Sequence, residues 1–162
     1  MCTCARFQAN PKEAPLVAIK RILRYLKHTS SIGLWYPKGA RFELVGYSNS
    51  DYAGCKVDRK GTSGECHLLG RSLVSWSSKK QNRVALSTAE AKYIATGACC
   101  VQILYMKQTL LDYGVVLEKV PLLCDNESAV KLANNPVQHS CTKHIDIRHH
   151  SLRDHVAKNN IS

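Results

Sequence analysis

The chain has 162 residues, which is enough for one ordinary domain with a hydrophobic core and a short appendage. A composition of 44% hydrophobic and 22% charged residues is typical of a globular protein and argues against intrinsic disorder. The formal net charge of +11, from 23 basic and 12 acidic residues, favours a polyanionic partner such as nucleic acid. No apolar run approaches the ~18 residues of a membrane span, so we expect no membrane partner.

Eight cysteines raise the question of disulfides or a structural zinc site. Their spacing supports neither, because the sequence contains no Cys-x-x-Cys pair. Cys141 and His144 come nearest to a metal-binding pattern but lack a second pair of ligands. We therefore expect reduced thiols and an intracellular protein, with cytoplasm or nucleus left open.

Residues 1–40 differ in pattern from the rest of the chain and are predicted to form a separate segment. Apolar residues recur with helical spacing from Pro15 to Leu26, and Pro15 suits a first helical turn. Basic residues lie mostly off this apolar stripe. They are interpreted either as a solvated face of a core-packing helix or as contacts to phosphate groups. Turn-forming residues between Ser30 and Gly39 then indicate a linker.

A predicted strand begins at Phe42 and alternates apolar and polar residues as far as Tyr47. Turn-forming residues follow it up to Gly54. Two further strands are predicted at residues 64–70 and 73–77, and the short connection between them indicates a hairpin. Three successive strands with short connections predict an antiparallel meander.

A long helix is predicted to begin after Ser87 and to end near Gly114. A short apolar strand at residues 120–124 follows, then a small helix capped by Asn126, and a last helix that starts near Thr142. The order of these elements predicts an α/β fold in which helices pack on a mixed sheet.

Three acidic residues lie where these elements begin or end. Asp51 follows the first strand, Glu90 opens the long helix, and Asp125 ends the later strand. We hypothesise that they form a carboxylate cluster. The structural alternative is that Glu90 completes a capping box with Ser87 and that Asp125 caps the short helix after it.

Six sequence blocks occur in order, at residues 46–54 (GYSNSDYAG), 61–64 (GTSG), 74–81 (VSWSSKKQ), 86–91 (LSTAEA), 124–129 (CDNESA) and 135–148 (NPVQHSCTKHIDIR). Together they resemble the ribonuclease H domain of copia-type retrotransposon Pol polyproteins. Residues 6–11 (RFQANP) and 21–26 (RILRYL) resemble the tail of the preceding reverse transcriptase.

The resemblance implies two domains, a reverse-transcriptase tail at 1–40 and a ribonuclease H-like domain at 41–162 that lacks its last strand and helix. It implies cleavage of RNA in RNA–DNA hybrids with two Mg²⁺ ions, or Mn²⁺, held by Asp51, Glu90 and Asp125. The reverse-transcriptase portion of the polyprotein is an expected partner. The basic residues expected to contact the hybrid are Lys79, Lys80, Arg83, Lys143 and Arg148.

This chain departs from the family pattern at two acidic positions. The family's first catalytic Asp directly follows Gly-Tyr-Ser, and here that position is Asn49. The start of the helix usually reads Glu-Ala-Glu-Tyr in the family, and here Lys92 stands at the position of the second Glu. Which of the two helix acids is the metal ligand stays open, as does a substitute role for Asp51. A fourth acid of the family falls beyond Ser162.

The resemblance therefore predicts a ribonuclease H-like domain with impaired hydrolase activity. One alternative is a non-catalytic basic module that binds nucleic acid. Another is a decayed element fragment that has no stable fold. A cooperative thermal transition would argue against the last.

Overall fold

The structure is a computed structural model, and it describes all residues except 1–3, 5–7, 40, 136–146, 159–160 and 162. The side chains of residues 147–151 also lie outside the description. The chain divides into two compact units, Met1–Trp35 and Tyr36–Ser162.

The first unit contains one long helix, α2 (Glu13–His28). None of its residues is buried. Apolar side chains on it, such as Leu23 and Leu26, remain 60% and 57% exposed. The helix is therefore amphipathic in sequence, as predicted, without a core of its own to cover its apolar stripe.

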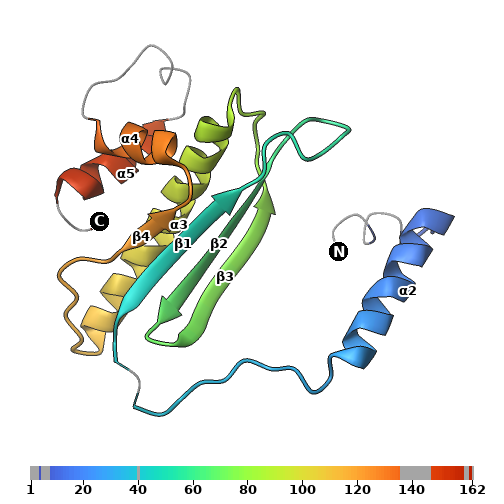
Figure 1. Cartoon of the computed structure of the whole chain (residues 1–162), viewed down its shortest axis with the longest axis horizontal. Helices are drawn as coiled ribbons and strands as arrows, with labels where there is room; N and C mark the ends of the chain where they lie inside the picture. The colour runs from blue at the N-terminus through green and yellow to red at the C-terminus, as the bar shows by residue number, and fades with distance from the viewer. Residues whose placement is uncertain (1–3, 5–7, 40, 136–146, 159–160, 162) are drawn as a thin grey trace. The chain divides into compact units, whose positions relative to one another are not determined.

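The second unit is built on a four-stranded sheet in the order β3-β2-β1-β4 (Figure 1). The strands are β1 (Leu44–Ser50), β2 (Thr62–Leu69), β3 (Ser72–Lys80) and β4 (Leu122–Cys124). Strands β1, β2 and β3 pair antiparallel, whereas β4 pairs parallel to β1. The predicted meander with one parallel strand is confirmed.

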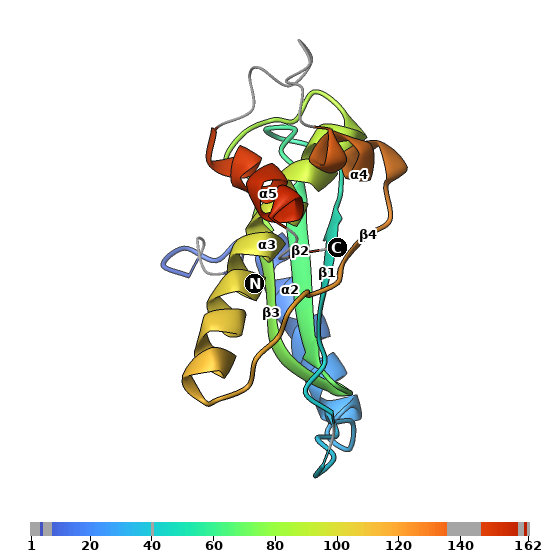
Figure 2. The ribbon, with the colours of Figure 1, turned by 90° about the vertical axis from the view of Figure 1, so that its left-hand side faces the viewer.

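Three helices accompany this sheet: α3 (Thr88–Asp112), α4 (Glu127–Asn134) and α5 (Ile147–Ala157). The long helix α3 lies along one face of the sheet and contacts β1, β2 and β4, and α5 packs against α3 (Figure 2). Among the described residues, no helix has the length and apolar character needed to cross a bilayer.

The interface between α3 and the sheet is made mainly by small side chains. Ala91, Ala95 and Cys99 are fully or almost fully buried along α3, and Ile103 follows them. On the strand, the Cβ that an alanine at Gly46 would carry lies 2.5 Å from Ile103 Cδ1. Any larger residue at this position would therefore have to displace the Ile103 side chain.

Several element boundaries differ from those predicted. Strand β1 continues through Asn49 to Ser50, because these residues pair with Gly64 and Ser63 of β2. Strand β3 likewise runs to Lys80. Pairing with a neighbouring strand satisfies the backbone of these polar segments, which side-chain pattern alone does not indicate. The predicted start of the last helix near Thr142 lies outside the described residues.

Candidate active site

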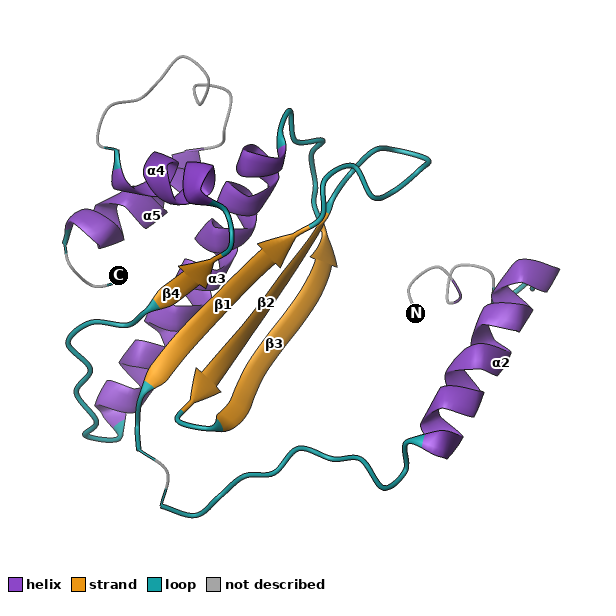
Figure 3. Ribbon diagram, in the orientation of Figure 1, coloured by secondary structure: helices purple, strands orange, loops and turns teal. Residues whose placement is uncertain are grey.

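The candidate site lies where the parallel strands β1 and β4 end, beside the first turns of α3 (Figure 3). Ser48 of β1 is in register with Cys124 of β4, so Asn49 and Asp125 occupy equivalent positions one residue further. Lys92, on the second turn of α3, reaches both. Its Nζ lies 2.9 Å from Asn49 Oδ1 and 2.5 Å from Asp125 Oδ1.

The ammonium of Lys92 is largely withdrawn from solvent, with 15% of its side chain exposed, whereas 62% of the Asp125 side chain is exposed. A hydrogen bond from Lys92 lowers the pKa of Asp125, and the positive charge adds to this effect. Asn49 Oδ1 also accepts a hydrogen bond from the Ser50 backbone N–H at 2.7 Å. The side chains of Asn49, Lys92 and Asp125 thus form a polar cluster in which the Lys92 ammonium contacts the other two.

Asp51 serves the loop after β1. Its Oδ1 accepts a hydrogen bond from the Thr62 backbone N–H, and its own N–H donates to Thr62 O at 3.1 Å. The carboxylate also lies close against Gly54, where an added Cβ would overlap Asp51 Oδ2. These contacts give Asp51 a role in closing the loop between β1 and β2.

Glu90 serves the start of α3. The Ser87 side chain accepts from the Glu90 N–H at 3.1 Å, as predicted for a helix cap. The Glu90 carboxylate in turn accepts from the Leu86 N–H at 2.7 Å, one residue earlier than a standard capping box. This buried carboxylate is therefore engaged in capping.

The three acids of the expected cluster are thus placed differently. Asp125 lies at the strand ends with Asn49 and Lys92, while the carboxylates of Asp51 and Glu90 bond to backbone N–H groups of their own segments. The role of all three as metal ligands stays a prediction.

The fit of two Mg²⁺ ions can be judged from the donors at the strand ends. These are one carboxylate, one amide oxygen already bonded to two N–H donors, and an ammonium that cannot ligate. A dication ~4 Å from an ammonium would meet a repulsion on the order of 8 kcal/mol at an effective dielectric of ~20. The donor set in this arrangement does not fit two dications.

A shallow groove of about 610 Å³ extends from this site over the sheet. Asn49 and Asp125 line one end of it, and Tyr47, Trp76 and Leu123 contribute apolar walls. These three side chains are 39%, 64% and 49% exposed. The groove therefore joins exposed aromatic surface to the polar contact around Lys92.

The predicted nucleic-acid contacts are only partly visible. Lys79 and Arg83 are exposed near the end of β3, whereas Lys80 is paired with Asp58 at 2.7 Å and donates to Cys55 Sγ at 3.1 Å. Lys143 and the side chain of Arg148 lie outside the described residues.

A second polar group was missed by the sequence reasoning. Among the described residues, Glu65, His67 and Cys99 are the group of three potential metal ligands whose ligand atoms all lie within 4.8 Å of one another. Glu65 and His67 are two apart in a strand, which places them on one face. That spacing was the available signal, but nothing in sequence indicated that Cys99 would face them.

Comparisons with known proteins agree on the kind of molecule. The chain is 40% identical over 153 residues to the retrovirus-related Pol polyprotein from transposon RE1 of Arabidopsis thaliana, which is 94% of this chain and 10% of that protein. It is 38% identical over 152 residues to the Pol polyprotein from transposon TNT 1-94 of Nicotiana tabacum, 94% of this chain and 11% of that protein. It thus spans about a tenth of the length of these curated relatives. No family model matches the chain.

Among solved structures, the N-terminal RNase H domain of Rv2228c from Mycobacterium tuberculosis, determined as a fusion with maltose-binding protein, shares the fold. The match has a TM-score of 0.51 at 10% identity and covers 74% of this chain and 78% of that chain. The fold expected from the motif blocks is thereby confirmed. This chain therefore has a ribonuclease H-like fold and is similar in sequence to a segment of retrovirus-related Pol polyproteins from transposons.

Proposed function

We propose that residues 36–162 bind RNA–DNA hybrids in the groove over the sheet and that Lys92 suppresses their metal-dependent cleavage. The observation that carries the proposal is the position of the Lys92 ammonium between Asn49 Oδ1 and Asp125 Oδ1. It places a positive charge at the strand ends, where the family resemblance predicts two dications.

Binding is supported by the charge and the shape of this surface. Residues 36–162 hold 17 basic and 11 acidic residues and so attract a phosphate backbone, and the groove offers the aromatic side chains of Tyr47 and Trp76. Trp76, which is 64% exposed, can pack against sugars or bases.

Binding would be tested by fluorescence anisotropy of a labelled RNA–DNA hybrid at low and at physiological salt, with double-stranded DNA as competitor. We expect affinity to fall at least about tenfold as salt rises from 50 to 200 mM, as a contact with several phosphates requires. Trp76→Ala and Lys79→Ala should each weaken binding. Lys119→Ala serves as the control. Lys119 is an exposed lysine that precedes β4, whereas Asp125 follows that strand at its other end. Undiminished binding by Trp76→Ala, which alters a residue that lines the groove, would refute the groove as the site.

Cleavage would be measured on the same hybrid with Mg²⁺ and with Mn²⁺. We expect the chain to bind without cutting. Metal-dependent cleavage by the unaltered chain would overturn the suppression by Lys92 and would favour Asp51, Glu90 and Asp125 as working ligands.

We also infer that residues 1–40 correspond to the tail of a reverse transcriptase. The similarity to both Pol polyproteins covers 94% of the chain and so includes most of this segment. The exposed apolar stripe of α2 is suited to packing on such a partner. A reverse-transcriptase segment from a related Pol polyprotein, added in trans, should slow hydrogen exchange in α2 but not in α3. Unchanged exchange in α2 would contradict the inference.

A further inference from the structure

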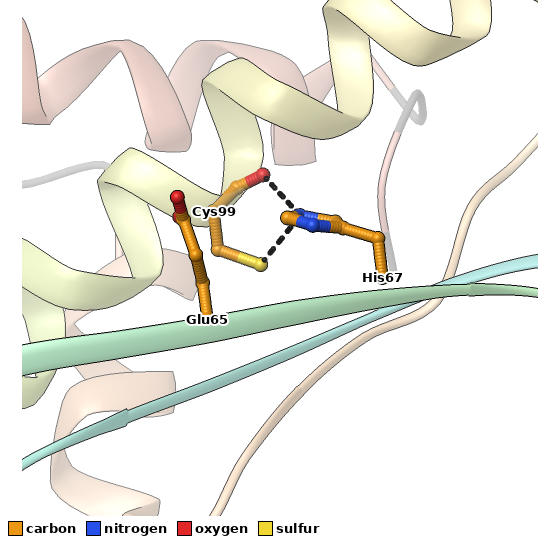
Figure 4. A group of neighbouring side chains, drawn as sticks. All are labelled: Glu65, His67 and Cys99. Atoms are coloured by element: carbon orange, nitrogen blue, oxygen red, sulfur yellow. Dashed lines mark hydrogen bonds between the residues drawn. The ribbon is translucent and has the colours of Figure 1, made fainter. Parts of the chain in front are cut away.

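The second polar group, Glu65, His67 and Cys99, lies between the sheet and α3 (Figure 4). His67 and Cys99 are each 0% exposed, and Glu65 is partly buried. The imidazole of His67 points from β2 toward Cys99, with its Nε2 at 3.3 Å from Cys99 Sγ and 3.4 Å from Cys99 O. Glu65 extends from the same strand toward the same helix.

Two atoms of this group are orphaned in the interior. His67 Nδ1 and Glu65 Oε2 are buried and have no hydrogen-bond partner among the described residues. A buried polar atom without a partner costs about 1–3 kcal/mol, so such atoms are rare in folded proteins. Both atoms belong to residues of the group, in which one ligand atom from each residue, the Cys99 sulfur included, lies within 4.8 Å of the others.

We propose that Glu65, His67 and Cys99 form a binding site for a transition-metal dication of the zinc type. The donors are an imidazole nitrogen, a sulfur and a carboxylate oxygen, which is a set that Zn²⁺ accepts. Thiolate and carboxylate together carry two negative charges, which balance the dication in a buried place. Mg²⁺ is disfavoured because it is a hard ion that avoids sulfur.

The distances suit this assignment. In tetrahedral zinc sites, sulfur and nitrogen ligands of one ion lie about 3.5 Å apart, given bond lengths near 2.3 and 2.0 Å. Cys99 Sγ and His67 Nε2 are 3.3 Å apart, and all three ligand atoms lie within 4.8 Å. A small movement of Glu65 completes a three-ligand site.

One further contact supports the site. The Ser77 hydroxyl donates to Glu65 Oε1 at 2.8 Å and so orients the carboxylate. Metal binding would replace the proton of the Cys99 thiol, which passes to the buffer.

The test is titration of the whole reduced chain, stripped of metal, with Co²⁺ and then Zn²⁺. Bound cobalt should show a thiolate charge-transfer band and the visible bands of tetrahedral coordination, and one equivalent of Zn²⁺ should remove both. Cys99→Ser should abolish the charge-transfer band. Cys100→Ser is the matched control, because Cys100 is the adjacent buried thiol of the same helix and lies outside the group.

Glu65→Gln provides a second variant that keeps the thiol, in case Cys99→Ser fails to fold. It should retain the charge-transfer band and weaken cobalt binding by at least about tenfold, while Ser77→Ala should weaken it by about tenfold through loss of orientation. The absence of a saturable band would overturn the proposal. A charge-transfer band that survives in Cys99→Ser would also overturn it, since other thiols would then bind the cobalt.

Discussion

Lys92 and Asp125 form an ion pair with Nζ and Oδ1 2.5 Å apart, at the point where the parallel strands of the sheet end. The pair is local, but it decides the charge of the candidate site. A lysine on α3 neutralises the one acid that the fold delivers there, and Asn49 completes its coordination by oxygen.

The first prediction concerns the pKa of Asp125. Lys92 lowers this pKa, so Lys92→Gln should raise it toward the ordinary value of about 3.9, as followed by NMR titration of the side chain. A depressed pKa stabilises the fold above the unfolded-state value, and this contribution is lost as pH falls through the folded-state pKa. Because most of the Asp125 side chain is exposed, we expect the ion pair to contribute at most about 0.5 kcal/mol to the free energy of unfolding. An unchanged pKa in the variant would show that the pair does not form in solution.

The second prediction is that two substitutions convert the site. Asn49→Asp with Lys92→Glu makes the local charge more negative by three, from one new acid and one reversed charge. We expect divalent-ion binding by calorimetry and cleavage of an RNA–DNA hybrid to appear together in this double variant. Asn49→Asp alone, which keeps the ammonium, should cleave far less because the cation still repels the metal.

The control for this conversion is Asn49→Asp with Lys119→Glu, which changes the net charge equally but leaves Lys92 in place. If the control binds divalent ions as well as the Lys92 variant does, overall charge rather than the Lys92 position is responsible. If neither cleaves, the engagement of Glu90 and Asp51 with backbone N–H groups is a further barrier.

The third prediction concerns the contact between β1 and α3. Gly46→Ala should destabilise the fold by about 1–3 kcal/mol, because its Cβ would overlap Ile103 Cδ1 in a fully buried position. Adding Ile103→Val removes that methyl and should recover part of the loss in urea unfolding. Gly64→Ala is the matched control, since its Cβ would come no nearer than 4.0 Å to Asn49 O. Equal losses from Gly46→Ala and Gly64→Ala would contradict the steric explanation.

The fourth prediction concerns Gln81, which joins three segments at the rim of the site. Its Nε2 lies 3.1 Å from Ser50 Oγ, 2.9 Å from Ser63 Oγ and 2.9 Å from Ala91 O, and its two hydrogens are shared among these three acceptors. Gln81→Ala should cost about 1–3 kcal/mol in thermal or urea unfolding, because the buried hydroxyls lose a donor. Gln108→Ala, which removes an exposed bond to Asp112 on α3, should change stability by less than about 0.5 kcal/mol. A loss no larger than that of the control would show that Gln81 is not a structural link.

The sequence by itself determined the elements and their order. Alternation in β1, the cap at Ser87 and the short connection before β3 are local signals, because they depend on neighbours a few residues away. The motif blocks likewise indicated the family, and Asn49 and Lys92 were visible as departures from its pattern. The sequence did not determine how far β1 and β3 extend, since pairing with β2 sets those limits.

Only the tertiary structure decided which groups meet. Lys92 and Asp125 are 33 residues apart, and the parallel pairing of β4 with β1 is what places Asp125 within reach of the second turn of α3. Glu65 and His67 were readable as one face of a strand, but the rotation of α3 against the sheet brings Cys99 to them. Asp51 and Glu90 carry carboxylates of the kind that bind metals, yet in the fold these carboxylates accept hydrogen bonds from the backbone N–H groups of Thr62 and Leu86. Contacts of this kind depend on distances across the sheet, and a one-dimensional pattern does not contain those distances.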